Sequence, residues 1–78
     1  MEKEIKVGVI FDRDNGLRPV WFIYMNNKHN IKTITYRWRV KKGLSYIEHY
    51  SVSDGQNLYE ITYDRINTVW KLENTYDI

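Results

Sequence analysis

The stretch of sequence that decides the fold is Ile34-Thr35-Tyr36-Arg37-Trp38-Arg39-Val40-Lys41. Its even-numbered positions are apolar and its odd-numbered positions are polar or cationic, an alternation with a period of two. Successive side chains of a β-strand point to opposite faces, so this pattern predicts a strand with one apolar and one cationic face. We expect the apolar face, which includes Trp38, to cover the core, and Arg37 and Arg39 to face solvent.

The composition is typical of a small β-sheet protein. A chain of 78 residues has room for one domain with a modest core, which must be dense in large side chains. Three Trp, seven Tyr and two Phe supply them, and aromatic residues favour strands. The absence of Cys excludes disulfides and thiolate zinc sites, and no apolar run is long enough to cross a membrane as a helix. We expect a single cytoplasmic domain over residues 1–78 that needs no cofactor.

Turn signals divide the chain into strands, and no segment shows sustained helical periodicity. Asp54-Gly55 is typical of a two-residue hairpin turn, and Lys41-Lys42-Gly43 fits a three-residue turn with Gly in the left-handed position. Residues 64–67 fit a four-residue loop. Residues 26–30 are interpreted as a five-residue loop, with a tighter Asn26-Asn27 turn as the alternative. The expected strands span residues 4–11, 19–25, 31–40, 44–52, 57–63 and 68–73.

The predicted turns also set the register between strands. The turn over residues 41–43 pairs Trp38 with Tyr46, and the next turn pairs Tyr50 with Tyr59. With these pairings the apolar side chains of the last four strands gather on one face, as a half-buried sheet requires. We therefore predict an all-β fold, an antiparallel meander of about six strands that curls into a small barrel or half-barrel. A two-layer sandwich is the alternative.

Positive charge is concentrated in the middle of the chain. The net charge is only +2, yet residues 15–47 contain seven Lys or Arg and no Asp or Glu. Such segregation can mark a surface that contacts an anionic partner. The candidate binding residues are Arg37, Arg39, Lys41, Lys42, Lys32, Lys28 and Arg18. The alternative is a solvated strand face kept cationic to discourage edge pairing.

The basic hairpin leads to the hypothesis of a non-enzymatic binding module for an anionic partner, either a nucleic acid or an acidic protein. Nucleic-acid binders on sheets interleave aromatic with basic side chains for base stacking. Here the alternation separates Tyr36 and Trp38 from Arg37 and Arg39, which favours contact with phosphates over stacking. A small protein-interaction domain that uses a sheet edge or an aromatic groove is the alternative.

Catalysis and metal binding find little support in the sequence. His49 beside Glu60 on neighbouring strands would be a minimal general-base pair, but no nucleophile motif accompanies it, and a structural cross-strand pair is the simpler interpretation. His29 lies in a predicted turn without an evident partner. A metal site needs three or four ligands, whereas the chain has two His and no Cys. We therefore expect no enzymatic activity and no bound metal.

Several of the core and turn positions resemble those of a known family. The pattern is Pro19-x-x-Phe22-x-Tyr24, Ile31, Tyr36-x-Trp38-Arg39, Gly43, Tyr50-x-Val52, Gly55, Tyr59-Glu60-Ile61 and Trp70-x-Leu72. Over residues 19–73 it is similar to a family of short, uncharacterised bacterial all-β proteins, although this chain has Asn26-Asn27 where a Gly turn is usual. The resemblance implies a β fold. Because some relatives are encoded near error-prone polymerases, it also implies a role close to DNA.

Overall fold

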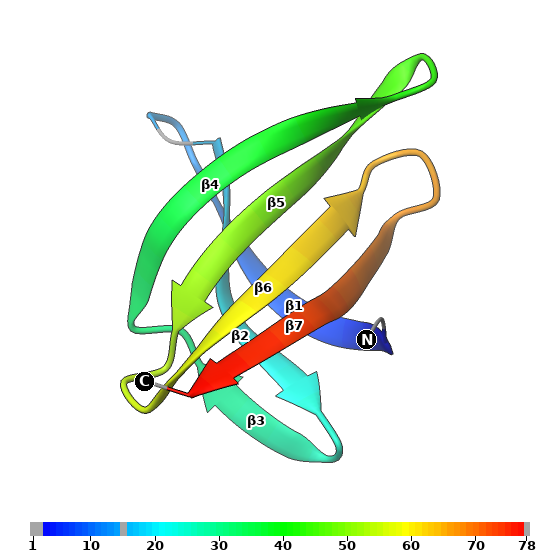
Figure 1. Ribbon diagram of the computed structural model, residues 1–78. Coiled ribbons are helices and arrows are strands. Elements are labelled where there is room, and N and C mark those ends of the chain that lie inside the picture. The colour runs from blue at the N-terminus through cyan, green and yellow to red at the C-terminus, as the bar shows by residue number, and fades with distance from the viewer. Residues whose placement is uncertain (1–2, 15, 78) are drawn as a thin grey trace.

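The structure, a computed structural model, describes residues 3–14 and 16–77. These residues form seven strands, and none of them belongs to a helix that could cross a membrane. The strands are β1 (Lys3–Asp12), β2 (Gly16–Tyr24), β3 (Asn27–Asn30), β4 (Thr33–Lys42), β5 (Ser45–Ser53), β6 (Asn57–Asp64) and β7 (Val69–Asp77). They form one curled antiparallel sheet in the order β3-β2-β1-β7-β6-β5-β4 (Figure 1). The predicted all-β class and half-barrel are confirmed, with one strand more than the six expected.

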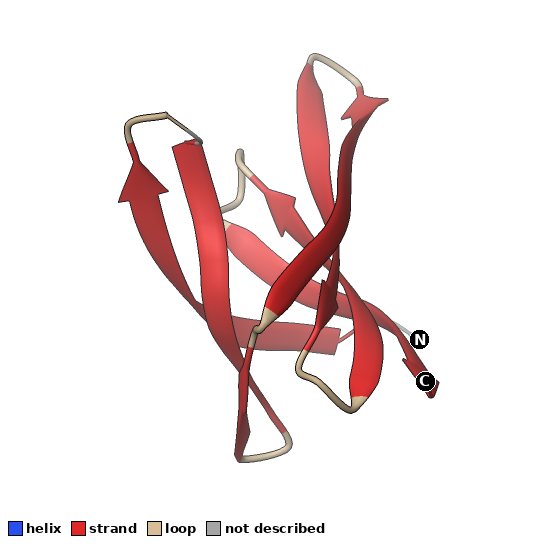
Figure 2. Ribbon diagram, turned by 90° about the vertical axis from the view of Figure 1, so that its left-hand side faces the viewer, coloured by secondary structure: helices blue, strands red, loops and turns tan. Residues whose placement is uncertain are grey.

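The sheet curls because its two edge strands, β3 and β4, follow one another in the chain. The link between them is held at both sides: the Ile31 amide donates to the Val20 carbonyl at 3.0 Å, and the Lys32 amide donates to the Ser53 carbonyl at 2.8 Å. These bonds draw the edges together at one end of the half-barrel, the closed end. At the opposite end the β1–β2 and β4–β5 hairpins diverge as two arms (Figure 2). We call them the first arm (residues 9–14 and 16–19) and the second arm (residues 36–49).

The core lies on the concave face of the sheet. Tyr50 of β5 stands opposite Ile61 of β6, which stands opposite Leu72 of β7. This row therefore carries buried side chains across three strands, and each burial stabilises the fold by about 1.5–3 kcal/mol. The buried hydrophobic side chains of the described residues are Ile5, Phe22, Tyr50, Val52, Tyr59, Ile61 and Leu72.

The predicted register of β5 against β6 is wrong by two residues, since Tyr50 pairs with Ile61 and not with Tyr59. The cause is a wider loop between the strands. The Asp54 carboxylate accepts hydrogen bonds from the amides of Gln56 and Asn57, both at 2.9 Å, and so stabilises an Asx-type turn. A shift by an even number leaves every side chain on its predicted face. The predicted core face of these two strands is therefore retained.

The last hairpin is displaced in the same way. Ile61 pairs with Leu72 and not with Trp70, because the loop runs over residues 65–68. Asp64 caps this loop by accepting a hydrogen bond from the Asn67 side chain at 2.9 Å. The shift is again two residues, so Trp70 and Leu72 still face the core.

The register of β4 against β5 is wrong by three residues. Trp38 pairs with His49, not with Tyr46, and a two-residue turn replaces the predicted three-residue one. Gly43 has a φ of 63° and occupies the first central position of this turn, as a type II′ turn requires. Glycine satisfies the predicted and the observed turn equally well, so its presence did not distinguish them.

Beyond a bulge at Thr35 the shift is odd and turns β4 over, so the predicted orientation of residues 36–41 is wrong. Before the bulge, Ile34 stands opposite Val52 and packs against the core, as predicted. Arg37 stands opposite Tyr50 and shares the concave face with it, as Arg39 does two residues further on. Tyr36 and Trp38 lie on the convex face. Trp38 finds cover there by packing between two rings, those of Tyr36 at 5.3 Å and His49 at 4.9 Å between centroids.

The loop predicted over residues 26–30 is also wrong. β2 and β3 are joined by a two-residue turn in which Met25 and Asn26 have φ values of 51° and 63°. Positive φ at both central positions is typical of a type I′ turn, whose twist matches that of paired strands. β3 therefore begins at Asn27, and the strand predicted over residues 31–40 loses its first two residues. The alternative turn at Asn26-Asn27 has the right length but lies one residue too far along the chain, since the turn residues are Met25 and Asn26.

Two predicted strand ends are corrected as well. β2 begins at Gly16 and not at residue 19, and β7 continues to Asp77. Pro19 is tolerated within β2 because it pairs with Val9 beside a bulge, where the regular hydrogen-bond ladder is interrupted. The turn residue Asn15 lies outside the described residues.

Candidate nucleic-acid interface

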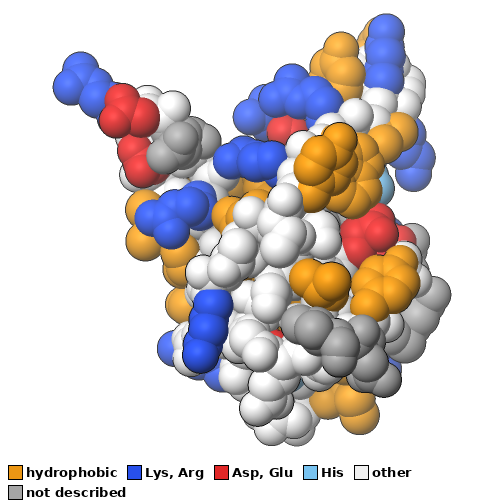
Figure 3. Space-filling model, turned by 60° about the vertical axis from the view of Figure 1, so that its left-hand side comes forward, with side chains coloured by type: hydrophobic (Ala, Val, Ile, Leu, Met, Phe, Trp, Pro, Cys, Tyr) orange, Lys and Arg blue, Asp and Glu red, His pale blue; other side chains and the backbone are white. Residues whose placement is uncertain are grey.

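A trough opens on the concave face between the two arms. Its volume is about 340 Å³. Figure 3 shows Lys and Arg side chains on both arms, including the side of one arm that faces the trough. The residues that line the trough are Phe11, Gly16, Leu17, Arg37, Arg39, Glu48, Tyr50, Tyr63 and Arg65.

Arg37 spans the inner end of the trough. Its guanidinium carbon lies 5.1 Å from the centroid of the Tyr50 ring, and its Nη2 donates a hydrogen bond of 3.4 Å to the Leu17 carbonyl on the first arm. A cation over an aromatic ring is stabilised by about 0.5–1 kcal/mol at an exposed site. The guanidinium is therefore held against the Tyr50 ring at the inner end of the trough.

Arg39 lies one step further along the same face. Its guanidinium carbon is 5.3 Å from the Tyr46 ring centroid, and its Nη2 lies 3.2 Å from Glu48 Oε1. The Arg39 side chain is 58% exposed and that of Glu48 only 14%. This pairing accounts for Glu48, a carboxylate that the sequence pattern places on the apolar face, because its register partner is a cation.

Arg65 is a trough residue that sequence reasoning missed, because it lies in the acidic last third of the chain. It belongs to the β6–β7 loop. Because β4 to β7 run antiparallel in succession, the β6–β7 loop emerges at the same end as the β4–β5 loop. Counting strands along the chain was therefore the signal that could have placed Arg65 near the basic hairpin. Beside it, Tyr63 stacks on Trp70 with 4.7 Å between centroids. Cationic and aromatic side chains are thus interleaved on the trough face.

The structure brings only part of the predicted site together. Arg37 and Arg39 line the trough. Lys41 stands opposite Tyr46 on the same face of β4 but outside the trough lining, and Lys42 lies beside a separate hollow on the convex side. The other three predicted cations lie elsewhere: Arg18 is on the convex face of β2, and Lys28 and Lys32 are at the closed end.

Burial raises the pKa of the Tyr50 hydroxyl above its ordinary value of 10.0, while the neighbouring Arg37 acts in the opposite direction. Tyr50 is therefore a neutral phenol near pH 7. The positive charge of Arg37 is not cancelled by the ring beneath it, and it remains available to a negatively charged ligand.

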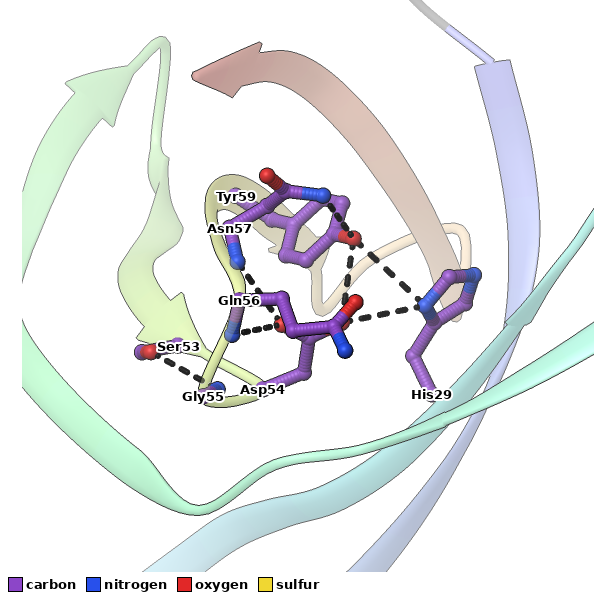
Figure 4. A network of polar contacts seen from close by, with 7 residues as sticks. All are labelled: His29, Ser53, Asp54, Gly55, Gln56, Asn57 and Tyr59. Carbon is purple, nitrogen blue, oxygen red and sulfur yellow. Dashed lines mark hydrogen bonds and ion pairs between the residues drawn. The ribbon is translucent and has the colours of Figure 1, made fainter. Parts of the chain in front are cut away.

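The closed end holds a polar network that the sequence did not reveal (Figure 4). His29 Nδ1 of β3 lies 3.3 Å from Asp54 Oδ2, and the Tyr59 hydroxyl donates to the same oxygen at 3.1 Å. Desolvation acts to raise the Asp54 pKa, but hydrogen bonds from the Asn57 and Gln56 amides, and from His29 and Tyr59, outweigh it and hold the pKa at about 2. The network ties an edge strand to the β5–β6 loop.

His49 and Glu60 form the predicted cross-strand pair, although His49 stands opposite Thr62 in the register. His49 Nδ1 lies 3.2 Å from Glu60 Oε2, and Asn74 Nδ2 donates to Glu60 Oε1 at 3.3 Å. The pair lies on the convex face, with the His49 ring stacked on Trp38. Within residues 3–14 and 16–77, no three His, Asp or Glu side chains are grouped to hold a metal ion.

Comparisons of the chain with protein-family models, with curated proteins and with solved structures find no significant match in any of the three. The resemblance to short bacterial all-β proteins therefore stays a prediction, and functional inference depends on the residues and geometry described above.

Proposed function

We propose that this protein is a non-enzymatic nucleic-acid-binding module that holds a phosphate backbone in the trough. The supporting observation is that Arg37, Arg39 and Arg65 share one concave face with aromatic side chains. Guanidinium groups bind phosphate oxygens through paired N–H donors. A concave surface that combines such groups with rings is the arrangement that single-strand binders use.

The orientation of the arginines favours this role. Arg37 and Arg39 are each held over a tyrosine ring, so little side-chain entropy remains to be lost when a phosphate binds. Each phosphate contact releases condensed counterions, so affinity falls as salt concentration rises. With only a few such contacts, binding is expected to be weak at physiological salt and clear at low salt.

The proposal is tested by fluorescence anisotropy with labelled oligonucleotides at several salt concentrations. Replacing Arg37 and Arg39 by Gln is expected to weaken binding at least tenfold and to reduce the slope of log K against log salt by about 1.4–1.8, which corresponds to two phosphate contacts. The matched control, Lys28→Gln with Lys32→Gln, removes the same charge from the closed end and should change affinity much less.

Two results would contradict the proposal. One is the absence of binding by the unmodified protein at low salt. The other is an equal loss of affinity in the control and in the arginine variant, since a general effect of net charge would then explain the data.

A second candidate function is supported by the edge of the sheet. Within the described residues β4 pairs only with β5, which leaves an edge of ten residues over Thr33–Lys42. An extended acidic peptide could add a strand there, whereas Arg37 and Arg39 would repel the same residues of a second copy. Binding of a Glu-rich peptide in the absence of any oligonucleotide binding would favour this function.

A further inference from the structure

We propose that the trough selects single-stranded over double-stranded nucleic acid, and that Phe11 provides the ring on which an unpaired base stacks. This inference depends on the proposed function, because it specifies the ligand of the same trough. It adds Phe11, a residue of the first arm that lies outside the acid-free segment of the chain. It also adds base stacking, a mode of contact that the sequence pattern disfavours.

Phe11 is unusual for a large apolar side chain, since 79% of its surface is exposed. It pairs with Leu17 in the register and shares its face. Leu17 packs against the core cluster, which shows that this face is the concave one. The Phe11 ring therefore stands on the wall of the trough that faces the second arm.

The other rings of the trough are already engaged. The guanidinium of Arg37 lies over Tyr50, and Tyr63 stacks on Trp70. No described ring or guanidinium covers Phe11. Among the aromatic side chains that line the trough, Phe11 is therefore the one whose face is open to a base.

The shape of the trough decides between one strand and two. Its volume of about 340 Å³ lies near the lower limit of roughly 300–1,000 Å³ for small-ligand sites, and residues of both arms line it. In a duplex each base is stacked and paired inside the helix, so its face cannot reach a ring on a protein wall without being flipped out. An unpaired base can enter while its phosphate meets Arg37 or Arg65 across the trough.

The experiment measures binding of a single-stranded oligonucleotide, its duplex, and a single strand of the same length that lacks bases. The unmodified protein should bind the first most tightly. Phe11→Ala should weaken that binding by about 5- to 150-fold, the effect of one stacked base, without changing the salt slope. The same variant should leave duplex and abasic binding unchanged, because neither offers an accessible base.

Two further variants separate stacking from simple apolar contact. Phe11→Trp keeps an aromatic face and should retain the affinity, whereas Phe11→Leu keeps only apolar surface and should resemble Phe11→Ala. Because Phe11 is largely exposed, these changes should leave the thermal unfolding midpoint nearly constant. DNA and RNA strands are compared side by side, since both offer the same base faces and phosphates.

Each outcome bears on one proposal. If single strands bind but Phe11→Ala has no effect, or if duplex binds more tightly, the inference is overturned and the proposed function stands. If neither form binds at low salt, the proposed function fails and takes this inference with it.

Discussion

The guanidinium of Arg37 lies over the ring of Tyr50, with 5.1 Å between its central carbon and the ring centroid. The alternating pattern of β4 predicts that these two side chains face opposite sides of the sheet. The contact joins Arg37, a candidate phosphate-binding side chain, to the core, because Tyr50 is buried between its strand neighbours. The orientation of Arg37 is therefore coupled to the packing of the half-barrel.

Removal of the Arg37 charge should change the pKa of Tyr50. Because Arg37 lowers a pKa that burial raises, Arg37→Gln should raise the Tyr50 pKa further. The measurement is a pH titration of the tyrosine ring carbons by NMR. The variant should also lose about 0.5–1 kcal/mol of unfolding free energy. Arg39→Gln is the matched control, and an equal shift of Tyr50 in that variant would contradict the assignment.

The register of β4 against β5 can be tested directly by NMR. Cross-peaks between the Trp38 indole and the His49 ring are expected, because the rings stack with centroids 4.9 Å apart. Cross-peaks between Trp38 and Tyr46 would instead support the register predicted from sequence. That result would move Arg37 out of the trough and remove the basis of the proposed function.

Stability at low pH should depend on Asp54. Its pKa is about 2 in the folded protein against an ordinary value of 3.8, so the charged form stabilises the fold above about pH 4 and this contribution is lost as pH falls through about 2. Asp54→Ala should cost about 1–2 kcal/mol at pH 7, measured by urea unfolding. The cost should shrink towards pH 2.

Asp54→Asn is the control for this prediction. Its side-chain oxygen can still accept the amide hydrogen bonds of the loop, but it carries no negative charge. It should therefore be more stable than Asp54→Ala at pH 7. If the two variants are equally unstable at every pH, the loop hydrogen bonds are not the source of the effect.

Gly8 should not tolerate a side chain. A Cβ at this position would overlap the indole of Trp21, which stands opposite Gly8 across the β1–β2 pair. Gly8→Ala is expected to cost about 1–3 kcal/mol, as overpacking generally does, measured by chemical unfolding. In the Trp21→Val background the same change should cost clearly less, since the obstructing ring is gone, and an undiminished cost would point to a backbone effect.

The core face of β5, β6 and β7 could be predicted from the sequence, and the exact pairing could not. Alternation places Tyr50, Ile61 and Leu72 on one face as long as any error in the predicted register is an even number of residues. Asp54 widens its loop, and Asp64 moves a four-residue loop one position along the chain, each by accepting hydrogen bonds from backbone amides. Such side-chain bonds add two residues to the pairing offset, and they preserve the face.

The candidate site was less predictable because it joins segments far apart in the chain. Phe11, Arg37 and Arg65 belong to three different hairpins and meet only when the sheet curls. The acid-free segment points to Arg37, whereas Arg65 lies among residues 48–78, where Asp and Glu outnumber Lys and Arg. Phe11 lies in the strand predicted over residues 4–11, and alternation alone does not tell that its side chain is exposed.

The amino-acid sequence by itself determined the strand content, the antiparallel succession of the last four strands and the core-facing side of the last three, because alternation and turn chemistry act between near neighbours. The pairing of β1 with β7, which leaves β3 and β4 as the edges, was decided by the tertiary structure. Only the tertiary structure decided which side of β4 faces the concave surface. Gly43 accommodates two turns of different length, and at the open end no opposite wall buries side chains strongly enough to select one register from hydrophobicity. The interleaving of arginines with aromatic rings therefore depends on long-range pairing and on the curvature of the sheet.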